Sequence, residues 1–86
     1  MPIISEFFGI AVSMYYNDHA PPHFHAEYAE HEVTMSIVRL EILYGNLPAP
    51  QLRMVRDWAR RHRTELLDNW ERARRGESLH DVPALK

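Results

Sequence analysis

The sequence predicts a small α+β domain, in which a three- to four-stranded antiparallel meander packs against a C-terminal helical segment, either one long helix or two. Three observations lead to this fold class. Apolar and polar residues alternate through residues 8–44, short connections separate the alternating stretches, and residues 52–73 change to a helical period. The chain has 86 residues, of which 45% are hydrophobic and 26% charged, so we expect a single domain over residues 1–86.

The first predicted strand covers residues 8–16, where β-branched and aromatic residues support an extended chain. Its apolar residues fall on one side: Ile10, Val12, Met14 and Tyr16. Two prolines and an Asn-Asp pair in residues 17–22 then end the strand and make a connection.

Residues 23–28 form the most informative strand, because successive side chains alternate between the two faces of a sheet. Its apolar and polar residues separate in this way: Phe24, Ala26 and Tyr28 against His23, His25 and Glu27. Residues 31–38 alternate again, and residues 40–44 form a further short strand. Three residues of that last strand are expected on one side: Leu40, Ile42 and Tyr44. Short connections between consecutive strands imply an antiparallel meander.

A helical segment begins near Asn46 and the two prolines that follow it. Its apolar residues keep one phase up to the stop signal at Gly76: Leu52, Val55, Ala59, His62, Leu66, Trp70 and Ala73. About 25 helical residues would span about 37 Å at about 1.5 Å per residue, which is long for so small a domain. We therefore expect either two helices that meet near Arg63 and Thr64, or one long helix that overhangs the sheet. Residues 77–86 are expected to have little regular structure.

Charge is divided unevenly along the chain, although the net charge is only −2. Residues 1–50 carry six acidic residues and one arginine, whereas residues 51–75 carry eight arginines and four acidic residues. The simplest interpretation is that the helices neutralise the acidic sheet, within one chain or across a dimer. The alternative is a stripe of four helical arginines that contacts nucleic acid or an acidic partner: Arg53, Arg56, Arg60 and Arg63.

The composition excludes several classes of protein. The chain has no cysteine, so no disulfide supports the fold and no thiolate serves as nucleophile or metal ligand. The N-terminus has no basic region of the kind that begins a secretory signal, and no apolar run approaches the about 20 residues that span a bilayer. We therefore expect a cytoplasmic protein that does not bind a membrane.

The histidine cluster His19, His23 and His25 is the only constellation with recognisable chemistry. His23 and His25 are two apart on a predicted strand, so their side chains share a face and can approach one ion or substrate. Either His19 or Asp18, in the preceding connection, could close the set. Such ligands with one open position suit catalytic zinc or another divalent transition metal. Glu27, one step further along the same face, could act as a ligand, as a partner of a ligating histidine or as a general base.

Two other interpretations of the same histidines stay open. The polar face of a half-exposed strand can contain histidine without any function, and Asp18 and His19 could simply cap the turn. A free histidine also titrates near neutrality, which would allow acid–base or RNA-cleaving chemistry without a metal.

Several stretches together carry a resemblance to a known family: Ile3-Ile4-Ser5, Phe7-Phe8-Gly9-Ile10, Met14-Tyr15-Tyr16-Asn17-Asp18-His19, Pro21-Pro22-His23-Phe24-His25-Ala26, Gly45-Asn46-Leu47-Pro48 and Leu66-Leu67 with Asn69-Trp70. They resemble a bacterial domain-of-unknown-function family, and the part from Asn17 to Ala26 is the most specific. The resemblance implies a small bacterial protein that is encoded beside another small protein, the pair forming a toxin–antitoxin-type module. It implies no particular catalytic residue.

Two functions of different classes follow. The first is a partner-binding component of a two-gene, toxin–antitoxin-like module, whose partner is the small protein encoded by the neighbouring gene. The second is a small metal-dependent or histidine-based hydrolase or nuclease that uses His19, His23 and His25, with zinc as the candidate cofactor. Nucleic-acid binding by the arginine stripe and a homodimer formed through a free sheet edge are further predictions.

Overall fold

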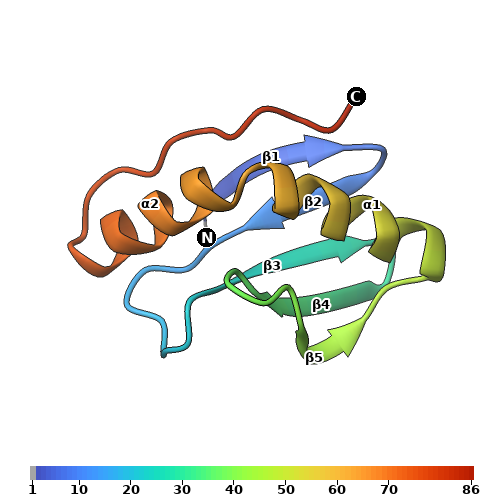
Figure 1. Cartoon of the computed structure of the whole chain (residues 1–86), viewed down its shortest axis with the longest axis horizontal. Coiled ribbons are helices and arrows are strands. Elements are labelled where there is room, and N and C mark those ends of the chain that lie inside the picture. The colour runs from blue at the N-terminus through green and yellow to red at the C-terminus, as the bar shows by residue number, and fades with distance from the viewer. Residues whose placement is uncertain (1) are drawn as a thin grey trace.

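The computed structural model of the chain describes residues 2–86 (Figure 1). Five antiparallel strands form one sheet in the order β1-β2-β3-β4-β5, and two helices cover one of its faces. The elements have these bounds: β1 Ile3–Phe7, β2 Ile10–Ser13, β3 His23–Tyr28, β4 His31–Ser36, β5 Ile42–Asn46, α1 Ala49–Arg61 and α2 Arg63–Arg74. The predicted α+β meander with a helical C-terminal segment is confirmed, with one strand more than expected.

The additional strand lies at the N-terminus, where the sequence predicts a single strand over residues 8–16. The structure forms a hairpin instead, in which β1 and β2 join through Phe8 and Gly9, both with positive φ (49° and 78°). A β-bulge between Ile3 and Ser5 leaves two consecutive residues of β1 buried, Ile4 and Ser5. Because this bulge breaks the alternation, a search for alternating residues does not find β1.

A second bulge decides which side chains of β5 face the helices. Ile42 lies opposite Met35, and Tyr44 lies opposite the next residue of β4, Thr34. Met35 and Thr34 are adjacent in their strand and therefore point to opposite faces of the sheet. The prediction that Ile42 and Tyr44 share a side is therefore wrong, since the extra residue, Leu43, shifts the register of β5.

The core lies between the covered face of the sheet and the helices. Trp58 of α1 is fully buried, and its ring centroid lies 5.3 Å from that of Phe7 and 6.0 Å from that of Phe24. Val12 of β2 and Val33 of β4, on either side of Ala26 in β3, are also fully buried. The covered face of the sheet therefore supplies the packing, and the polar residues of the same strands are left on the open face.

The helical segment is two helices, which is one of the two predicted alternatives. They join at His62, whose φ and ψ of −119° and 25° end α1. A straight helix of about 37 Å would exceed the longest dimension of the molecule, 33 Å, so the break keeps both helices on the sheet. Neither helix has the length and apolar character needed to cross a membrane, within the part of the chain that is described.

The C-terminal residues 77–86 contain no helix or strand, as predicted, yet they are fixed along the sheet and helices (Figure 1). The indole N–H of Trp58 donates to the carbonyl oxygen of Pro83 at 2.8 Å. The backbone N–H of Val82 donates to the carbonyl oxygen of Ile4 at 2.8 Å. The segment therefore covers the outer edge of β1, and within residues 2–86 the outer edge of β5 stays free.

A substitution at Gly45 tests the close approach of β4 and β5. An added Cβ at Gly45 would lie 2.1 Å from the carbonyl oxygen of Glu32, and Gly45 also has a positive φ of 69°. We expect Gly45→Ala to lower the free energy of unfolding by about 2–5 kcal/mol, through backbone strain and the steric clash together. Gly76→Ala is the matched control, because Gly76 has a φ of 74° and nothing within 4 Å of an added Cβ. The control should lose only about 1 kcal/mol, as measured by chemical denaturation, and equal losses in the two variants would contradict this account.

Candidate metal centre

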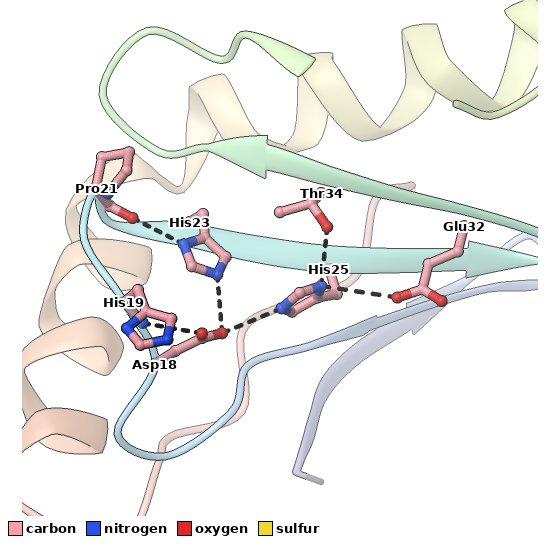
Figure 2. Close-up of polar contacts among 7 residues, drawn as sticks. All are labelled: Asp18, His19, Pro21, His23, His25, Glu32 and Thr34. Carbon is pink, nitrogen blue, oxygen red and sulfur yellow. Dashed lines mark hydrogen bonds and ion pairs between the residues drawn. The ribbon is translucent and has the colours of Figure 1, made fainter. Parts of the chain in front are cut away.

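Strand β3 holds two histidines on the open face of the sheet, as the alternation of the sequence predicts (Figure 2). Phe24 and Ala26, between and after them, are fully buried on the covered face. The ring centroids of His23 and His25 are 5.2 Å apart, and the ring planes are nearly perpendicular at 84°. The two imidazoles are therefore close enough to act on the same atom.

Asp18 completes the cluster from the connection between β2 and β3. Its Oδ2 lies 2.8 Å from Nε2 of His23 and 3.3 Å from Nε2 of His25 (Figure 2). Its other oxygen, Oδ1, accepts a hydrogen bond from the backbone N–H of His19 at 2.9 Å. One carboxylate oxygen thus faces two imidazole nitrogens while the other is held by the chain.

His23 faces Asp18 with Nε2, its inner nitrogen, and faces Pro21 with Nδ1, its outer nitrogen. The hydrogen-bond partner of Nδ1 determines which of the two nitrogens carries the hydrogen in the neutral ring. Nδ1 of His23 lies 2.7 Å from the carbonyl oxygen of Pro21, which can only accept a hydrogen bond, so Nδ1 carries the hydrogen. In a neutral ring, Nε2 then presents a lone pair to Asp18, which also only accepts when it is ionised. A lone pair and a carboxylate oxygen at 2.8 Å repel each other unless a cation, a proton or a metal ion, lies between them.

His25 repeats this arrangement. Its Nδ1 lies 3.1 Å from Oγ1 of Thr34 and 3.7 Å from Oε2 of Glu32, and the carboxylate favours a hydrogen on Nδ1. Nε2 of His25 is then also left to face Asp18. Histidines that ligate metals are typically held in this way, with the second ring nitrogen donating to a carbonyl, a hydroxyl or a carboxylate.

The three inner atoms have the spacing of a metal ligand set. Asp18, His23 and His25 each offer one ligand atom, and these three atoms all lie within 4.8 Å of one another. Ligands of a tetrahedral zinc ion, each about 2.0–2.1 Å from the metal, lie about 3.3 Å apart, close to the observed 2.8 and 3.3 Å. The side chains of His23, His25 and Asp18 are 9%, 12% and 21% exposed, so little water competes for these positions.

A cavity of about 370 Å³ opens beside the cluster. The cluster and the connection before β3 form one side of it, and Leu43 and Tyr44 of β5 form part of the other. The Tyr15 ring packs on His25 with centroids 4.3 Å apart, and Trp70 packs on His23 at 5.0 Å. The imidazoles are thus fixed by aromatic neighbours, and the cavity leaves room for a bound molecule.

The charges around the cluster favour a bound cation. Burial raises the pKa of the Asp18 carboxyl, but the hydrogen bond from the His19 N–H and those from the rings of His25 and His23, which donate when Nε2 carries a proton, outweigh it, so the pKa lies below the ordinary 3.8. Burial also raises the pKa of Tyr15 above its ordinary 10.0, and three carboxylates add to the shift: Glu32, Glu27 and Asp18. The Asp18 side chain is therefore ionised and the Tyr15 hydroxyl protonated at neutral pH.

The predicted site residues are only partly brought together. Asp18, His23 and His25 converge, whereas the His19 ring is not part of the converging set, although His19 lines the cavity and its backbone holds Asp18. Glu27 lies on the same face but does not contact the cluster; Glu32, directly opposite Glu27 on β4, does.

Three residues of the site are absent from the sequence-based prediction: Tyr15, Glu32 and Thr34. Thr34 pairs with His25 across β3 and β4, and that register is what brings its hydroxyl to the ring. Ser13 pairs with His25 on the other side, and its hydroxyl is buried without a hydrogen-bond partner in the described chain. Alternation within one strand gives the faces but not the pairing between strands, so the sequence carried no signal for these contacts.

The predicted arginine stripe serves the fold at two of its four positions. Arg56 donates to the carbonyl oxygen of Leu40 at 3.3 Å, and Arg63 donates to that of Ile37 at 3.2 Å, so both fasten the β4–β5 connection. Arg60 pairs with Asp57 on its own helix at 2.8 Å, and Arg53 is exposed.

The fold and site define a small α+β domain with an aspartate–histidine cluster on an open sheet face. A family model described as a domain of unknown function, DUF4160, matches residues 9–71, and the chain belongs to this family. The matched region includes the whole cluster and both helices up to Glu71. No curated protein and no solved structure matches the chain.

Asp18→Asn tests the electrostatics of the cluster in the metal-free protein. At neutral pH we expect the substitution to lower the free energy of unfolding by about 1–2 kcal/mol, because the His19 N–H then donates to a neutral amide oxygen and no longer to a carboxylate. The Asp18 pKa is lower in the folded protein than the ordinary 3.8, so its contribution is complete above that value and is lost as the pH falls through the folded value. Chemical denaturation should show a difference between the two proteins that closes as the pH falls through the folded pKa of Asp18. A difference that does not change with pH would contradict the assignment.

Proposed function

We propose that Asp18, His23 and His25 bind one divalent transition metal ion, with zinc as the best candidate, and that this centre supports hydrolysis. The observation that carries the proposal is the meeting of two imidazole lone pairs and a carboxylate oxygen, each fixed by a second contact. A cation at this point turns a repulsive arrangement into an attractive one. A bound zinc ion would supply a water whose pKa is lowered to about 7, a nucleophile at neutral pH.

The arrangement fits a catalytic metal centre better than a structural one. Structural zinc sites typically have four protein ligands and are closed, whereas catalytic sites have three and keep one position for water or substrate. Here three ligands converge beside a cavity of about 370 Å³. The Glu32 carboxylate lies 3.7 Å from Nδ1 of His25, on the side of the ring that faces away from Asp18, and would support this histidine as a ligand.

The surroundings favour ester or amide bonds over phosphodiesters as targets. Glu27, Glu32 and Asp18 all act on Tyr15, so the region next to the cavity is negative. A polyanion such as RNA would be repelled there. Of the two predicted enzymes, a hydrolase of esters or amides therefore fits the site better than a nuclease.

Zinc titration into the metal-free protein tests the ligand set. Calorimetry should give one site per chain, and His25→Ala and His23→Ala should each weaken binding by about 100-fold or more. Thr34→Val should weaken it by about tenfold, because it removes the partner of His25 Nδ1. His62→Ala is the matched control, because His62 is not part of the cluster and pairs instead with Glu65, at a distance of 2.7 Å. This variant should bind zinc as the unmodified chain does.

Circular dichroism of each variant separates a lost ligand from a lost fold. Hydrolysis of 4-nitrophenyl acetate by the zinc-loaded chain should fall in His25→Ala and persist in His62→Ala. Equal zinc affinity in all the variants would refute the metal site. A metal that binds as described but supports no hydrolysis would refute only the enzymatic part.

A second candidate function is a partner-binding role in a bacterial, cytoplasmic two-gene module of the toxin–antitoxin type. The observation that favours it is the free edge of the sheet, where all five residues of β5 are exposed. Val38, just before β5, is 58% exposed and Tyr44 is 78% exposed, so apolar surface accompanies the edge. An edge strand with apolar side chains is a template for pairing with another chain.

Co-expression with the product of the neighbouring gene tests the partner-binding role. We expect a tagged chain to retain that protein through affinity and size-exclusion chromatography, because the exposed edge and its apolar side chains become buried. Tyr44→Asp should reduce the retention by placing a charge in the interface. A chain that stays monomeric and does not retain its neighbour would exclude this role.

A further inference from the structure

The two edges of the sheet differ in how they are covered. The outer edge of β1 receives the C-terminal segment, through the hydrogen bond from Val82 to Ile4. No strand or segment of residues 2–86 pairs with the outer edge of β5, which lies at the margin of the molecule in Figure 1. Proteins commonly protect such edges with charged residues, yet Ile42–Asn46 contains none.

A row of acidic side chains crosses the open face and ends at this edge. The strand register places one residue from each strand in line: Glu6, Ala11, Glu27, Glu32 and Asn46. Glu27 and Glu32 lie directly opposite each other in neighbouring strands. Like charges in that position destabilise a sheet, so the free protein carries a cost at this place.

The arginines of the chain do not relieve this charge. Those of the helices pair chiefly with acids on or next to the helices, as in Arg61 with Asp57 at 3.1 Å and Arg72 with Asp68 at 2.9 Å. Within residues 2–86, no glutamate of the row lies within ion-pair distance of an arginine or lysine, and Glu32 has only His25 at 3.7 Å. The predicted neutralisation of the sheet by the helices of the same chain is therefore not formed.

We propose that the free edge of β5 binds an extended, lysine- or arginine-rich segment of a partner protein, with the neighbouring acidic row as its charge complement. The backbone of β5 offers main-chain pairing to an added strand, about 4.8 Å away. A basic side chain on the open-face side of that strand would pass the uncharged Asn46 and approach Glu32, one strand further in. The inference rests on the partner-binding function and gives the chemistry of the partner; it does not depend on the metal.

The charge of the row selects among the occupants of the edge. In a second copy of this chain, the same strand would bring a second acidic row toward the first, and the two would repel. Nucleic acid has the wrong sign. A basic protein segment is the class of partner that satisfies both the unpaired backbone and the uncompensated glutamates.

Fluorescence anisotropy with a labelled decapeptide of alternating lysine and threonine tests the proposal at low ionic strength. The full chain should bind this peptide, and Glu27→Gln with Glu32→Gln should weaken binding by about fivefold or more. Glu65→Gln with Glu71→Gln changes the net charge equally, but on the exposed surface of α2, and should leave binding within about twofold. N-methylation of the central five peptide bonds keeps the charge and blocks strand pairing, so it should abolish binding.

Three results would overturn the proposal. The first is equal weakening of peptide binding by the two double variants, which would indicate an effect of net charge alone. The second is unchanged binding of the N-methylated peptide. The third is self-association of the chain, observed by sedimentation, without peptide binding. Co-purification of the neighbouring protein separates this inference from the function it rests on. Retention by the Glu27→Gln, Glu32→Gln variant at the level of the unmodified chain would leave the partner-binding role standing and overturn the acidic surface.

The same variant has a second readout. Removing the opposed charges of Glu27 and Glu32 should raise the thermal midpoint of the free chain while it weakens peptide binding. A purely structural role for these residues predicts the opposite effect on stability, and a lowered midpoint would count against the proposal.

Discussion

The site depends on one interaction, the approach of a single carboxylate oxygen to two imidazole nitrogens. Oδ2 of Asp18 lies 2.8 and 3.3 Å from the Nε2 atoms of His23 and His25. The carbonyl oxygen of Pro21 accepts a hydrogen bond from Nδ1 of His23, and the Thr34 hydroxyl and Glu32 carboxylate favour the same tautomer in His25. Three electron-pair donors therefore meet at one point, and a cation is the component that makes this stable.

The rest of the fold holds that point in place. Packing of Phe24 and Trp58 on the covered face fixes β3, and alternation then directs its histidines to the open face. In the connection after β2, the backbone N–H of His19 donates a hydrogen bond to Asp18 and holds its carboxylate next to these histidines. The two faces of the sheet therefore have different roles. The face that packs on the helices provides the core, and the open face holds the ionisable groups next to a free sheet edge.

Much of this arrangement could be predicted from the sequence, because it depends on local rules. Alternation identifies β3 with the correct bounds and places His23 and His25 together, and the prolines after Asn46 announce the helical segment. The rules fail where the chain departs from regular geometry. The bulge near Ile4 hides β1, and the extra residue at Leu43 reverses the facing of Tyr44. Thr34 and Glu32 join the site through strand register, and the choice of Asp18 over His19 depends on the three-dimensional course of a connection, neither of which the local pattern contains.

X-ray absorption at the zinc edge, recorded on the zinc-loaded chain, tests the central claim most directly. We expect two nitrogen ligands at about 2.0–2.1 Å from the zinc ion and oxygen ligands in the remaining positions. Scattering from the outer atoms of the imidazole rings should identify the two nitrogen ligands as histidines. The His25→Ala chain should show one imidazole or no bound zinc. A shell of oxygen atoms alone, or a spectrum that is the same in both proteins, would mean that the cation between Asp18 and the two histidines is not a metal ion.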